Sequence, residues 1–371
     1  MYHYLRDALK KTKATLFNLP GYRTREKLVI FDSDDWGSIR VPGKQQRNQL
    51  ISMGIDMNDN CYNQYDCLEN EDDLAALYEV LKNHKDTHGY HPTFEMNTVM
   101  TNPDFDRIAE GNYSQYHCED FITTYQRYWQ KDLMPLWRQG MDAGLVFPQF
   151  HAREHLNVSL WMKALQQGEK LTLSAFKYGF FGQSGMTPSI HHPHYLAAFH
   201  HQNTEDLEDK KVILSAGLDA FEEVFGYRSR SWIACNYTWH CELEHVALDH
   251  GVNIVKSQRA QLQPDVHTGK LNPKYHFTGQ KNQFHQRYLV RNAIFEPAEN
   301  PSYDWVNSCL NDIHLAFALG KPAIISSHRV NYIGSISEEN RTENLKALDK
   351  LIKQMLISWP DIRFCSSIDI F

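Results

Sequence analysis

Short β-branched runs alternate with longer helical patterns along the whole chain, and this alternation limits most strongly how it can fold. The runs that we expect to form strands lie at 27–31, 92–97, 146–150, 231–234, 253–256, 288–291, 323–326 and 363–365. Strands that alternate with helices favour a mainly parallel sheet joined by right-handed crossovers. We therefore predict an α/β fold, a distorted (β/α)7-8 barrel.

The domain organisation follows from the same pattern. Helices are predicted over 71–84, 119–141, 204–225, 241–250, 304–319 and 338–357, and a further helix begins in the sequence HAREHLNVSLWMKAL at residue 151. No repeat or linker divides the chain, so we expect a single domain over 27–371 after an N-terminal helical extension over 1–26. Residues 174–202 are irregular and aromatic-rich, which predicts a long functional insertion. We expect 258–286 to be mostly loop.

Composition excludes several classes of protein. Lys and Arg number 38 against 45 Asp and Glu, a net charge of −7 that provides no footprint for nucleic acid. No apolar run approaches the roughly 20 residues of a membrane span. Seven cysteines without paired spacing argue against a disulfide framework, and the N-terminus shows no secretory pattern. We therefore expect a cytoplasmic protein with reduced thiols.

Polar side chains collect just after three of the predicted strands. In a (β/α) barrel, chemistry is located at the carboxyl ends of the strands, where the βα loops meet. Clusters after separate strands are therefore expected to share one site. Their members are Asp32, Asp34 and Asp35 after the first strand, His151 and His155 after the third, and His328 and Arg329 after the strand at 323–326.

The pattern H-x-x-x-H, formed by His151 and His155, is a candidate metal site. On a helix these imidazoles would lie about 40° apart on one face, a spacing suited to chelating one ion. A carboxylate as third ligand would leave positions open for water and substrate, as in a catalytic zinc site. The alternative is an exposed histidine pair on a first helical turn.

The acidic cluster offers both a ligand and a base. Strand side chains alternate, so Asp32 and Asp34 would face the same side if the strand continues. One of two neighbouring acids can bind the metal while the other accepts a proton from water. Either Asp34 or Asp35 could be the ligand, and parity favours Asp34. His328 could protonate a leaving group, or it could be a structural histidine.

This order of clusters resembles the polysaccharide deacetylase family of carbohydrate esterases, over about 27–371. The resemblance implies a metal-dependent hydrolase that removes N- or O-acetyl groups from a saccharide or saccharide conjugate. The segment SWIACNYTW (231–239) is similar to the turn whose backbone N–H holds the oxyanion in that family. The implied metal is zinc, with cobalt, nickel or manganese as alternatives.

The resemblance also implies a role for individual residues. The implied residues are the catalytic Asp32 and His328, the metal ligands Asp34, His151 and His155 with Asp35 as the alternative ligand, and the oxyanion or substrate residues Asn236, Tyr237, Arg230 and Trp36. Ile233, Ala234 and Cys235 stand where the family carries an arginine that orients the base, and Arg228 or Arg230 are the candidate replacements. The family's Asp-Trp motif, which supplies the partner of the late histidine, is absent.

Two other functions remain open. One is a non-catalytic sugar-binding relative on the same barrel, which the missing motifs favour. The other is a zinc peptidase, because HAREH also matches H-x-x-E-H with Glu154 as general base and Glu222 or Glu223 as a third ligand. The aromatic residues of 174–202 would either close over a sugar ring or form a small core. The sequence does not indicate an oligomeric state.

Overall fold

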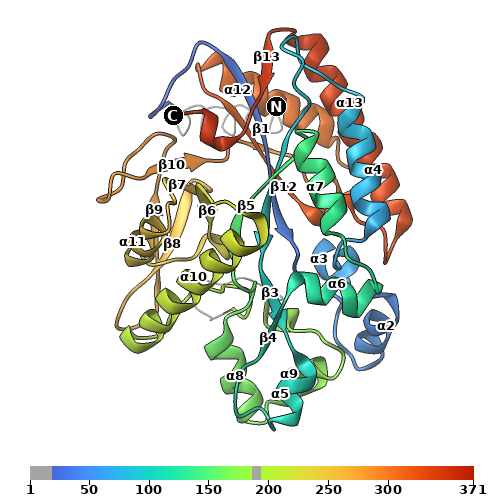
Figure 1. Cartoon of the computed structure of the whole chain (residues 1–371), viewed down its shortest axis with the longest axis vertical. Coiled ribbons are helices and arrows are strands. Elements are labelled where there is room, and N and C mark those ends of the chain that lie inside the picture. Colours follow the sequence, from blue (N-terminus) through green and yellow to red (C-terminus); the bar gives the residue numbers. More distant parts are fainter. Residues whose placement is uncertain (1–18, 186–193) are drawn as a thin grey trace, which may run out of the picture.

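The computed structural model describes residues 19–185 and 194–371, and a nine-stranded sheet runs through its centre (Figure 1). Neighbouring strands of this sheet are parallel. In spatial order the strands are β10 (Arg287–Val290), β7 (Ile254–Ser257), β6 (Ser231–Ile233), β5 (Val146–Ala152), β2 (Phe94–Val99), β1 (Lys27–Trp36), β12 (Ala323–His328) and β11 (Ala293–Ile294), with β13 (Ile362–Phe364) paired to the start of β1. The predicted α/β barrel fold is confirmed, as a curled parallel sheet that ends at β10 and β11.

Strand β1 is the central strand and carries the acidic cluster. Its apolar part is buried on both faces, which is typical of a parallel strand covered by helices on each side. The pairing with β12 sets Asp34 opposite His328, and the pairing with β2 sets Asp32 opposite Glu95. These registers bring polar residues from distant parts of the sequence to one end of the sheet.

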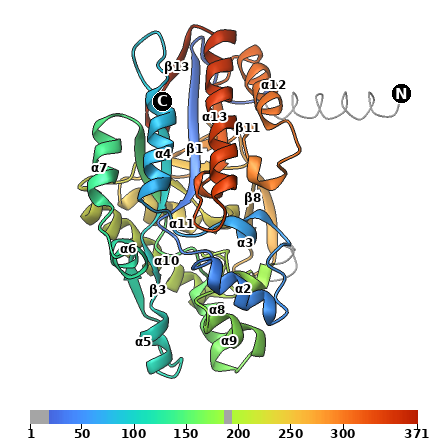
Figure 2. The same ribbon diagram turned by 90° about the vertical axis from the view of Figure 1, so that its right-hand side faces the viewer.

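Helices cover the outside of the curled sheet (Figures 1 and 2). One group comprises α4 (Glu71–Lys82), α7 (Met134–Asp142), α12 (Trp305–Ala318) and α13 (Glu338–Ser358), and a second comprises α10 (Thr204–Phe225) and α11 (Glu242–Asp249). Helix α10 begins at Asn203, whose side chain accepts a hydrogen bond from the Asp206 N–H, and ends at Gly226 in the left-handed conformation.

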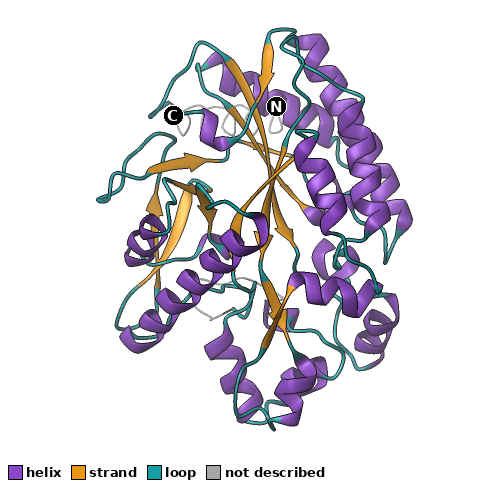
Figure 3. Cartoon of the chain, viewed as in Figure 1, coloured by secondary structure: helices purple, strands orange, loops and turns teal. Residues whose placement is uncertain are grey.

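Shorter elements gather beyond the carboxyl ends of the central strands (Figure 3). They are α2 (Lys44–Ser52), α3 (Cys61–Tyr65), α5 (Phe105–Glu110), α6 (Phe121–Trp129), α8 (Val158–Gln166), α9 (Lys170–Phe176) and the antiparallel pair β3 (Thr101–Pro103) and β4 (Cys118–Asp120). The 3-10 turns are η1 (Gly182–Gly185), η2 (Cys235–Tyr237), η3 (Pro297–Glu299), η4 (Arg329–Tyr332) and η5 (Ser367–Asp369). The βα loops that carry the candidate site are therefore enclosed by secondary structure.

Three predicted segments differ from the structure. The single helix over 119–141 is wrong, because Gln130 adopts a left-handed φ of 53° and separates α6 from α7. The loop over 258–286 contains an antiparallel hairpin of β8 (Ala260–Pro264) and β9 (Leu271–Tyr275). The helix expected from residue 151 begins at Val158, since 151 and 152 still belong to β5 and Asn157 caps α8.

The aromatic insertion forms part of the core where it is described. Phe180 and Phe181 are 0% and 2% exposed, and Phe176 is buried with Trp161 in a small apolar cluster. This favours the small-core alternative for these side chains. Residues 186–193, in the middle of the insertion, lie outside the described residues.

Residues 1–18 of the predicted N-terminal extension also lie outside the described residues. Over 19–26 the chain is irregular and not helical, and the Lys321 ammonium donates to the carbonyls of Pro20, Gly21 and Tyr22 at 2.8, 3.0 and 2.8 Å. All seven cysteines are free thiols, as the sequence predicted. None of the helices among the described residues has the length and apolar character needed to span a membrane.

Candidate active site

A bulge at the end of β1 separates the acidic side chains. The pairing of β1 with β2 shifts register between Ser33 and Trp36, and Asp35 takes a left-handed φ of 76°. Aspartate tolerates this region better than most residues, because its short polar side chain can bond locally. Asp32 and Asp34 share one side, as alternation predicts, while the bulge turns Asp35 toward His151 and His155. Regular alternation, on which the preference for Asp34 depends, ends at this bulge.

Asp35 is the carboxylate that meets the two histidines. Its Oδ1 lies 3.4 Å from the His151 Nε2 and 3.3 Å from the His155 Nε2. Asp34 instead accepts hydrogen bonds from Arg291. The geometry thus favours Asp35, the alternative that the sequence left open, as the carboxylate partner of the imidazoles.

The two histidines converge without sharing a helix. His151 ends β5 and His155 lies in the loop before α8, so the helical-face argument for their spacing is wrong. Their ring centroids are nevertheless 5.2 Å apart, because the chain turns directly after the strand. The His151 Nδ1 lies 2.7 Å from the carbonyl of Ile233, which can only accept, so Nδ1 carries the proton and Nε2 faces Asp35 as a potential ligand.

Cys235 approaches the same imidazoles from β6. Its Sγ lies 3.6 Å from the His151 Nε2, and one donor atom from each of His151, His155 and Cys235 lies within 4.8 Å of the others. Burial raises the pKa of the Cys235 thiol, but the two imidazoles outweigh burial and lower it to about 7. We call Asp35, His151, His155 and Cys235 the imidazole cluster.

The imidazole cluster has the chemistry of a divalent metal site. Burial lowers the pKa of His155, but Cys235 and Asp35 outweigh burial and raise it to about 9. Two buried anionic donors therefore face the rings, and the surrounding charge favours a cation among them. Imidazole nitrogen, carboxylate oxygen and thiolate sulfur are the ligands that zinc prefers. The residues present thus fit the implied metal.

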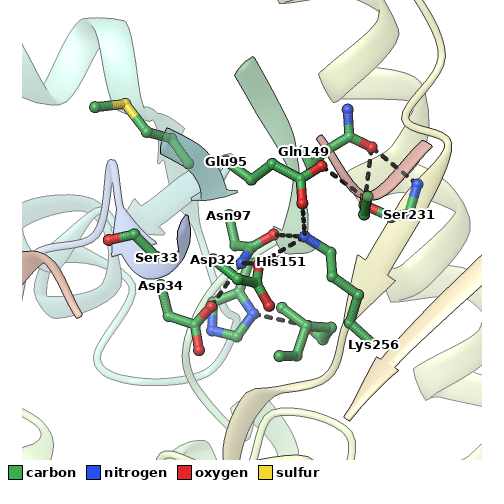
Figure 4. Close-up of polar contacts among 12 residues, drawn as sticks. Asp32, Ser33, Asp34, Glu95, Asn97, Gln149, His151, Ser231 and Lys256 are labelled. Carbon is green, nitrogen blue, oxygen red and sulfur yellow. Dashed lines mark hydrogen bonds and ion pairs between the residues drawn. The ribbon is translucent and has the colours of Figure 1, made fainter. Parts of the chain in front are cut away.

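A second cluster surrounds the other two aspartates (Figure 4). Arg291 donates from Nε to Asp32 at 2.7 Å and from both terminal nitrogens to Asp34 at 2.7 and 2.6 Å. The Asn97 amide donates to each aspartate at 2.7 Å, and the Lys256 ammonium donates to Asp32 at 2.8 Å. We call Asp32, Asp34, Asn97, Lys256 and Arg291 the arginine cluster.

Both carboxylates of the arginine cluster are held in the ionised form. Burial raises the pKa of Asp32 and of Asp34, but Arg291 outweighs burial and brings both pKa values below their ordinary value. Asp32 is 0% exposed and receives bonds from Arg291, Lys256 and Asn97. Two cations hold Asp32, whereas Asp34 is bonded to one cation and lies next to His328, so Asp34 is the better placed of the two for the predicted base role. Asp34 lies at the edge of this cluster, 3.6 Å from His328.

His328 has a carboxylate partner that the sequence did not reveal. Its Nδ1 lies 2.6 Å from the Oε1 of Glu296, which follows β11, and the Asn331 amide donates to the other Glu296 oxygen at 2.7 Å. Burial lowers the pKa of His328, but Glu296 outweighs burial and raises it to about 9. Glu296 thus supplies the carboxylate that the absent Asp-Trp motif left unidentified.

The predicted oxyanion residues lie beside the arginine cluster. Asn236 and Tyr237 both have left-handed φ values, 54° and 52°, so the turn after Cys235 is sharply bent. The Tyr237 N–H donates to the Ala234 carbonyl at 3.0 Å, while its hydroxyl accepts from Arg291 at 3.0 Å.

Among the described residues, the side chains of Trp36, Arg228 and Arg230 form no hydrogen bond or ion pair with either cluster. Trp36 is fully buried, and its indole N–H donates to Ser33 at 2.9 Å. Arg228 and Arg230 precede β6 and lie at the amino end of that strand, opposite the site, where Arg228 pairs with Glu222 at 2.9 Å. Arg291 contacts the aspartates instead, so both candidate replacements for the orienting arginine are corrected by the structure.

The peptidase alternative finds no geometric support. Arg153 holds both oxygens of Glu154, at 2.6 and 2.9 Å, and Thr101 contacts one of them at 3.2 Å. Glu222 is engaged by Arg228 on the surface of α10. Glu154 is thus held by Arg153 and Thr101, whereas Asp35 is the carboxylate that meets the two imidazoles.

A small cavity adjoins the imidazole cluster. Its volume is ≈ 10 Å³, enough for about one water molecule. It is lined by Asp35, Ser38, Ile39, Arg40, Asp66, His155, Phe181 and Leu196. The described residues therefore leave room beside Asp35 and His155 for a small polar molecule, and Arg40 supplies a cation at its rim.

Five residues of the site escaped sequence reasoning, namely Asn97, Cys235, Lys256, Arg291 and Glu296. Lys256 lies inside an apolar strand, and Arg291 directly follows another. A charged side chain within or just after an apolar strand could have marked both residues as candidates for the site. Glu296 follows a strand of two residues that the pattern did not identify, and Cys235 follows the predicted strand at 231–234 without a polar cluster to mark it. The roles of these residues depend on which strands pair with each other, and the sequence alone does not reveal the strand pairing.

Comparison with known proteins gives weak similarity over most of the chain. No family model matches the sequence, and no curated protein matches it. A probable polysaccharide deacetylase from Pseudomonas aeruginosa PAO1 is similar in structure, with a TM-score of 0.48 and 9% identity over 93% of this chain and 90% of that chain. A putative polysaccharide deacetylase from Mycobacterium smegmatis has a TM-score of 0.42 and 13% identity over 95% and 92% of the two chains.

A 4-alpha-glucanotransferase from Thermococcus litoralis is also similar, with a TM-score of 0.45 and 9% identity over 93% of this chain. The matched region spans only 40% of that longer chain.

Proposed function

We propose that this protein is a metal-dependent hydrolase that removes an N- or O-acetyl group from a saccharide. The observation that carries the proposal is the position of the Asp35 carboxylate, 3.4 and 3.3 Å from the Nε2 atoms of His151 and His155, next to an oriented second carboxylate, Asp34. His328 completes the set from the opposite side of β1. This is the combination that the resemblance in motif order implies, with Asp34 and Asp35 in the roles first given to Asp32 and Asp34.

The imidazole cluster would hold a divalent ion, zinc in the first instance. When bound, such an ion supplies Lewis-acid activation of the acetyl carbonyl and of a water molecule. Asp34 is the proposed general base that accepts the water proton. Arg291 and Asn97 fix its orientation and keep it ionised, so it is ready to accept at neutral pH.

His328 is the proposed general acid for the leaving sugar amine or alcohol. Its contact with Glu296 keeps the imidazole protonated near neutral pH, which suits proton donation. The Tyr237 N–H is already used by the Ala234 carbonyl, so we assign the oxyanion contact to the Asn236 N–H. Tyr237 then acts as a positioning residue through its hydroxyl and Arg291.

Acetate release tests the proposal directly. Purified protein would be incubated with zinc and with N-acetylated or O-acetylated oligosaccharides, and free acetate would be measured by a coupled assay. We expect release by the wild type and a fall of at least about 100-fold in Asp34→Asn, in line with the loss of a general base. Asp304→Asn, at the exposed start of α12, is the matched control and should retain activity.

Two outcomes would contradict the proposal. Full acetate release by Asp34→Asn would remove the assigned base. Saturable binding of an acetylated oligosaccharide with no release under any metal would support the second candidate function, a non-catalytic sugar-binding relative. A specific observation favours that second candidate, because the Cys235 thiol contacts the same imidazoles that substrate chemistry requires.

A further inference from the structure

We propose that Cys235 is itself a ligand of the metal, so that the centre is a Cys-His-His-Asp site and not an Asp-His-His site. This inference rests on the proposed function only for the presence of a divalent ion. It concerns the donor set of that ion, and it holds or fails separately from acetate release.

The donor atoms of Cys235 and Asp35 both lie at ligand-like distances from the imidazole nitrogens. Tetrahedral zinc with bonds of about 2.0–2.1 Å to nitrogen and oxygen and about 2.3 Å to sulfur places N and O about 3.3 Å apart, and N and S about 3.5 Å apart. Asp35 lies 3.4 and 3.3 Å from the nitrogens of His151 and His155, and the Cys235 sulfur lies 3.6 Å from the His151 nitrogen. Each of these distances is close to that of two donors on one zinc ion, and the donors that all lie within 4.8 Å of one another are those of His151, His155 and Cys235.

The position of Cys235 is fixed by the backbone around it. Its side chain is 0% exposed, and the residue stands between the end of β6 at Ile233 and the left-handed pair Asn236 and Tyr237. The Ile233 carbonyl that precedes it accepts the hydrogen bond from His151 Nδ1. One turn therefore both orients the first imidazole and presents the thiol to its other nitrogen.

Other buried thiols lack such surroundings. Cys309 is equally buried, but it lies within the apolar core, where burial raises its pKa well above the ordinary value. The difference is the imidazole pair, which gives Cys235 partners that a core cysteine does not have. Cys309 is therefore a matched control for substitution of a buried thiol.

Thiolate ligation has two consequences for the centre. A soft sulfur donor favours zinc or cobalt over manganese, which narrows the alternatives that an Asp-His-His set leaves open. Four protein ligands also complete a tetrahedral site, whereas a catalytic zinc keeps one position open. A substrate would then have to displace Cys235 or Asp35 before it could bind the ion.

Cobalt absorption tests the donor set. The metal-free protein would be titrated with Co²⁺, and we expect one equivalent to produce an intense near-ultraviolet thiolate-to-cobalt band. Cys235→Ser should lose this band. It should still bind cobalt, with an affinity lower by roughly tenfold or more. Cys309→Ser should retain the band at full intensity.

A measurement on the wild-type protein tests the ligand assignment even if Cys235→Ser does not fold. X-ray absorption of the zinc-loaded wild type should show one sulfur neighbour at about 2.3 Å. Absence of that sulfur, absence of cobalt binding, or a band that persists in Cys235→Ser would each overturn the inference. Acetate release without a sulfur neighbour would leave the proposed function intact, and a sulfur neighbour without acetate release would leave only the ligand assignment.

Discussion

The two charged clusters at the end of β1 are neighbours, yet they balance their charges in different ways. In the arginine cluster, the ionised Asp32 and Asp34 are held by the fixed cations Arg291 and Lys256. In the imidazole cluster, Asp35 and the Cys235 thiol face the titratable rings of His151 and His155. A buried carboxylate with a permanent cation needs no ion from solution, whereas the imidazole cluster requires either protons or a metal.

Of the changes that test this contrast, removal of Arg291 should lower the free energy of unfolding the most. Arg291→Met leaves two buried carboxylates without their shared cation, and breaking a buried ion pair from one side costs about 3–5 kcal/mol. The free energy of unfolding, measured by urea denaturation, should fall by that amount. A loss below about 1 kcal/mol would mean that Lys256 and Asn97 alone neutralise the arginine cluster.

Metal addition should stabilise the protein through the imidazole cluster. Zinc at about 100 times its dissociation constant should raise the free energy of unfolding of the metal-free protein by about 2.7 kcal/mol. His155→Ala should abolish this gain, whereas His84→Ala, which removes a histidine paired with Asp349 on α13, should keep it. An equal gain in His155→Ala would place the ion elsewhere.

The link between His328 and Glu296 should produce an intermediate effect. Glu296 raises the pKa of His328 from its ordinary 6.5 to about 9, so the imidazole is protonated at neutral pH. In Glu296→Gln the pKa should fall by at least one unit, about 1.4 kcal/mol, and the ring should become more nearly neutral. Titration of the metal-free protein by histidine NMR measures the shift.

An unchanged His328 titration in Glu296→Gln would mean that Asp34 governs this ring. His328 would then belong to the arginine cluster, because Asp34 and not Glu296 would set the pKa of its ring. Glu299→Gln, at a neighbouring carboxylate of η3, is the control and should shift the titration less.

The smallest effect is expected at Arg228. This arginine, a replacement candidate from the sequence, pairs with Glu222 where both side chains are about half exposed. Arg228→Ala should change the free energy of unfolding by only about 0–1 kcal/mol, the usual range for surface pairs. A loss as large as that in Arg291→Met would contradict the view that burial, and not charge alone, sets the arginine cluster apart.

The fold and the location of the site could be predicted because both depend on local patterns. Alternating apolar runs indicated the parallel sheet, and polar residues after the strands indicated its functional end. His151, His155 and His328 follow or end strands that the pattern identified. Their convergence follows from the geometry of a parallel sheet, in which all carboxyl ends lie at one side.

The pairing of acids with their partners could not be predicted in the same way. Parity assigned Asp34 to the metal because it assumes a regular strand, and a bulge depends on how β1 pairs with β2. Arg291 and Glu296 reach the site from β10 and β11, more than two hundred residues after β1. Such contacts depend on register between distant segments, which one sequence without relatives does not disclose.

The left-handed torsion of Asp35 also restricts which residues can replace it. Asparagine and glycine accept that torsion at little cost, and neither can carry a negative charge. Substitution of Asp35 by asparagine would therefore remove the negative charge and leave the backbone conformation unchanged. At this position, one amide in place of the carboxylate would remove the charge that faces both imidazoles.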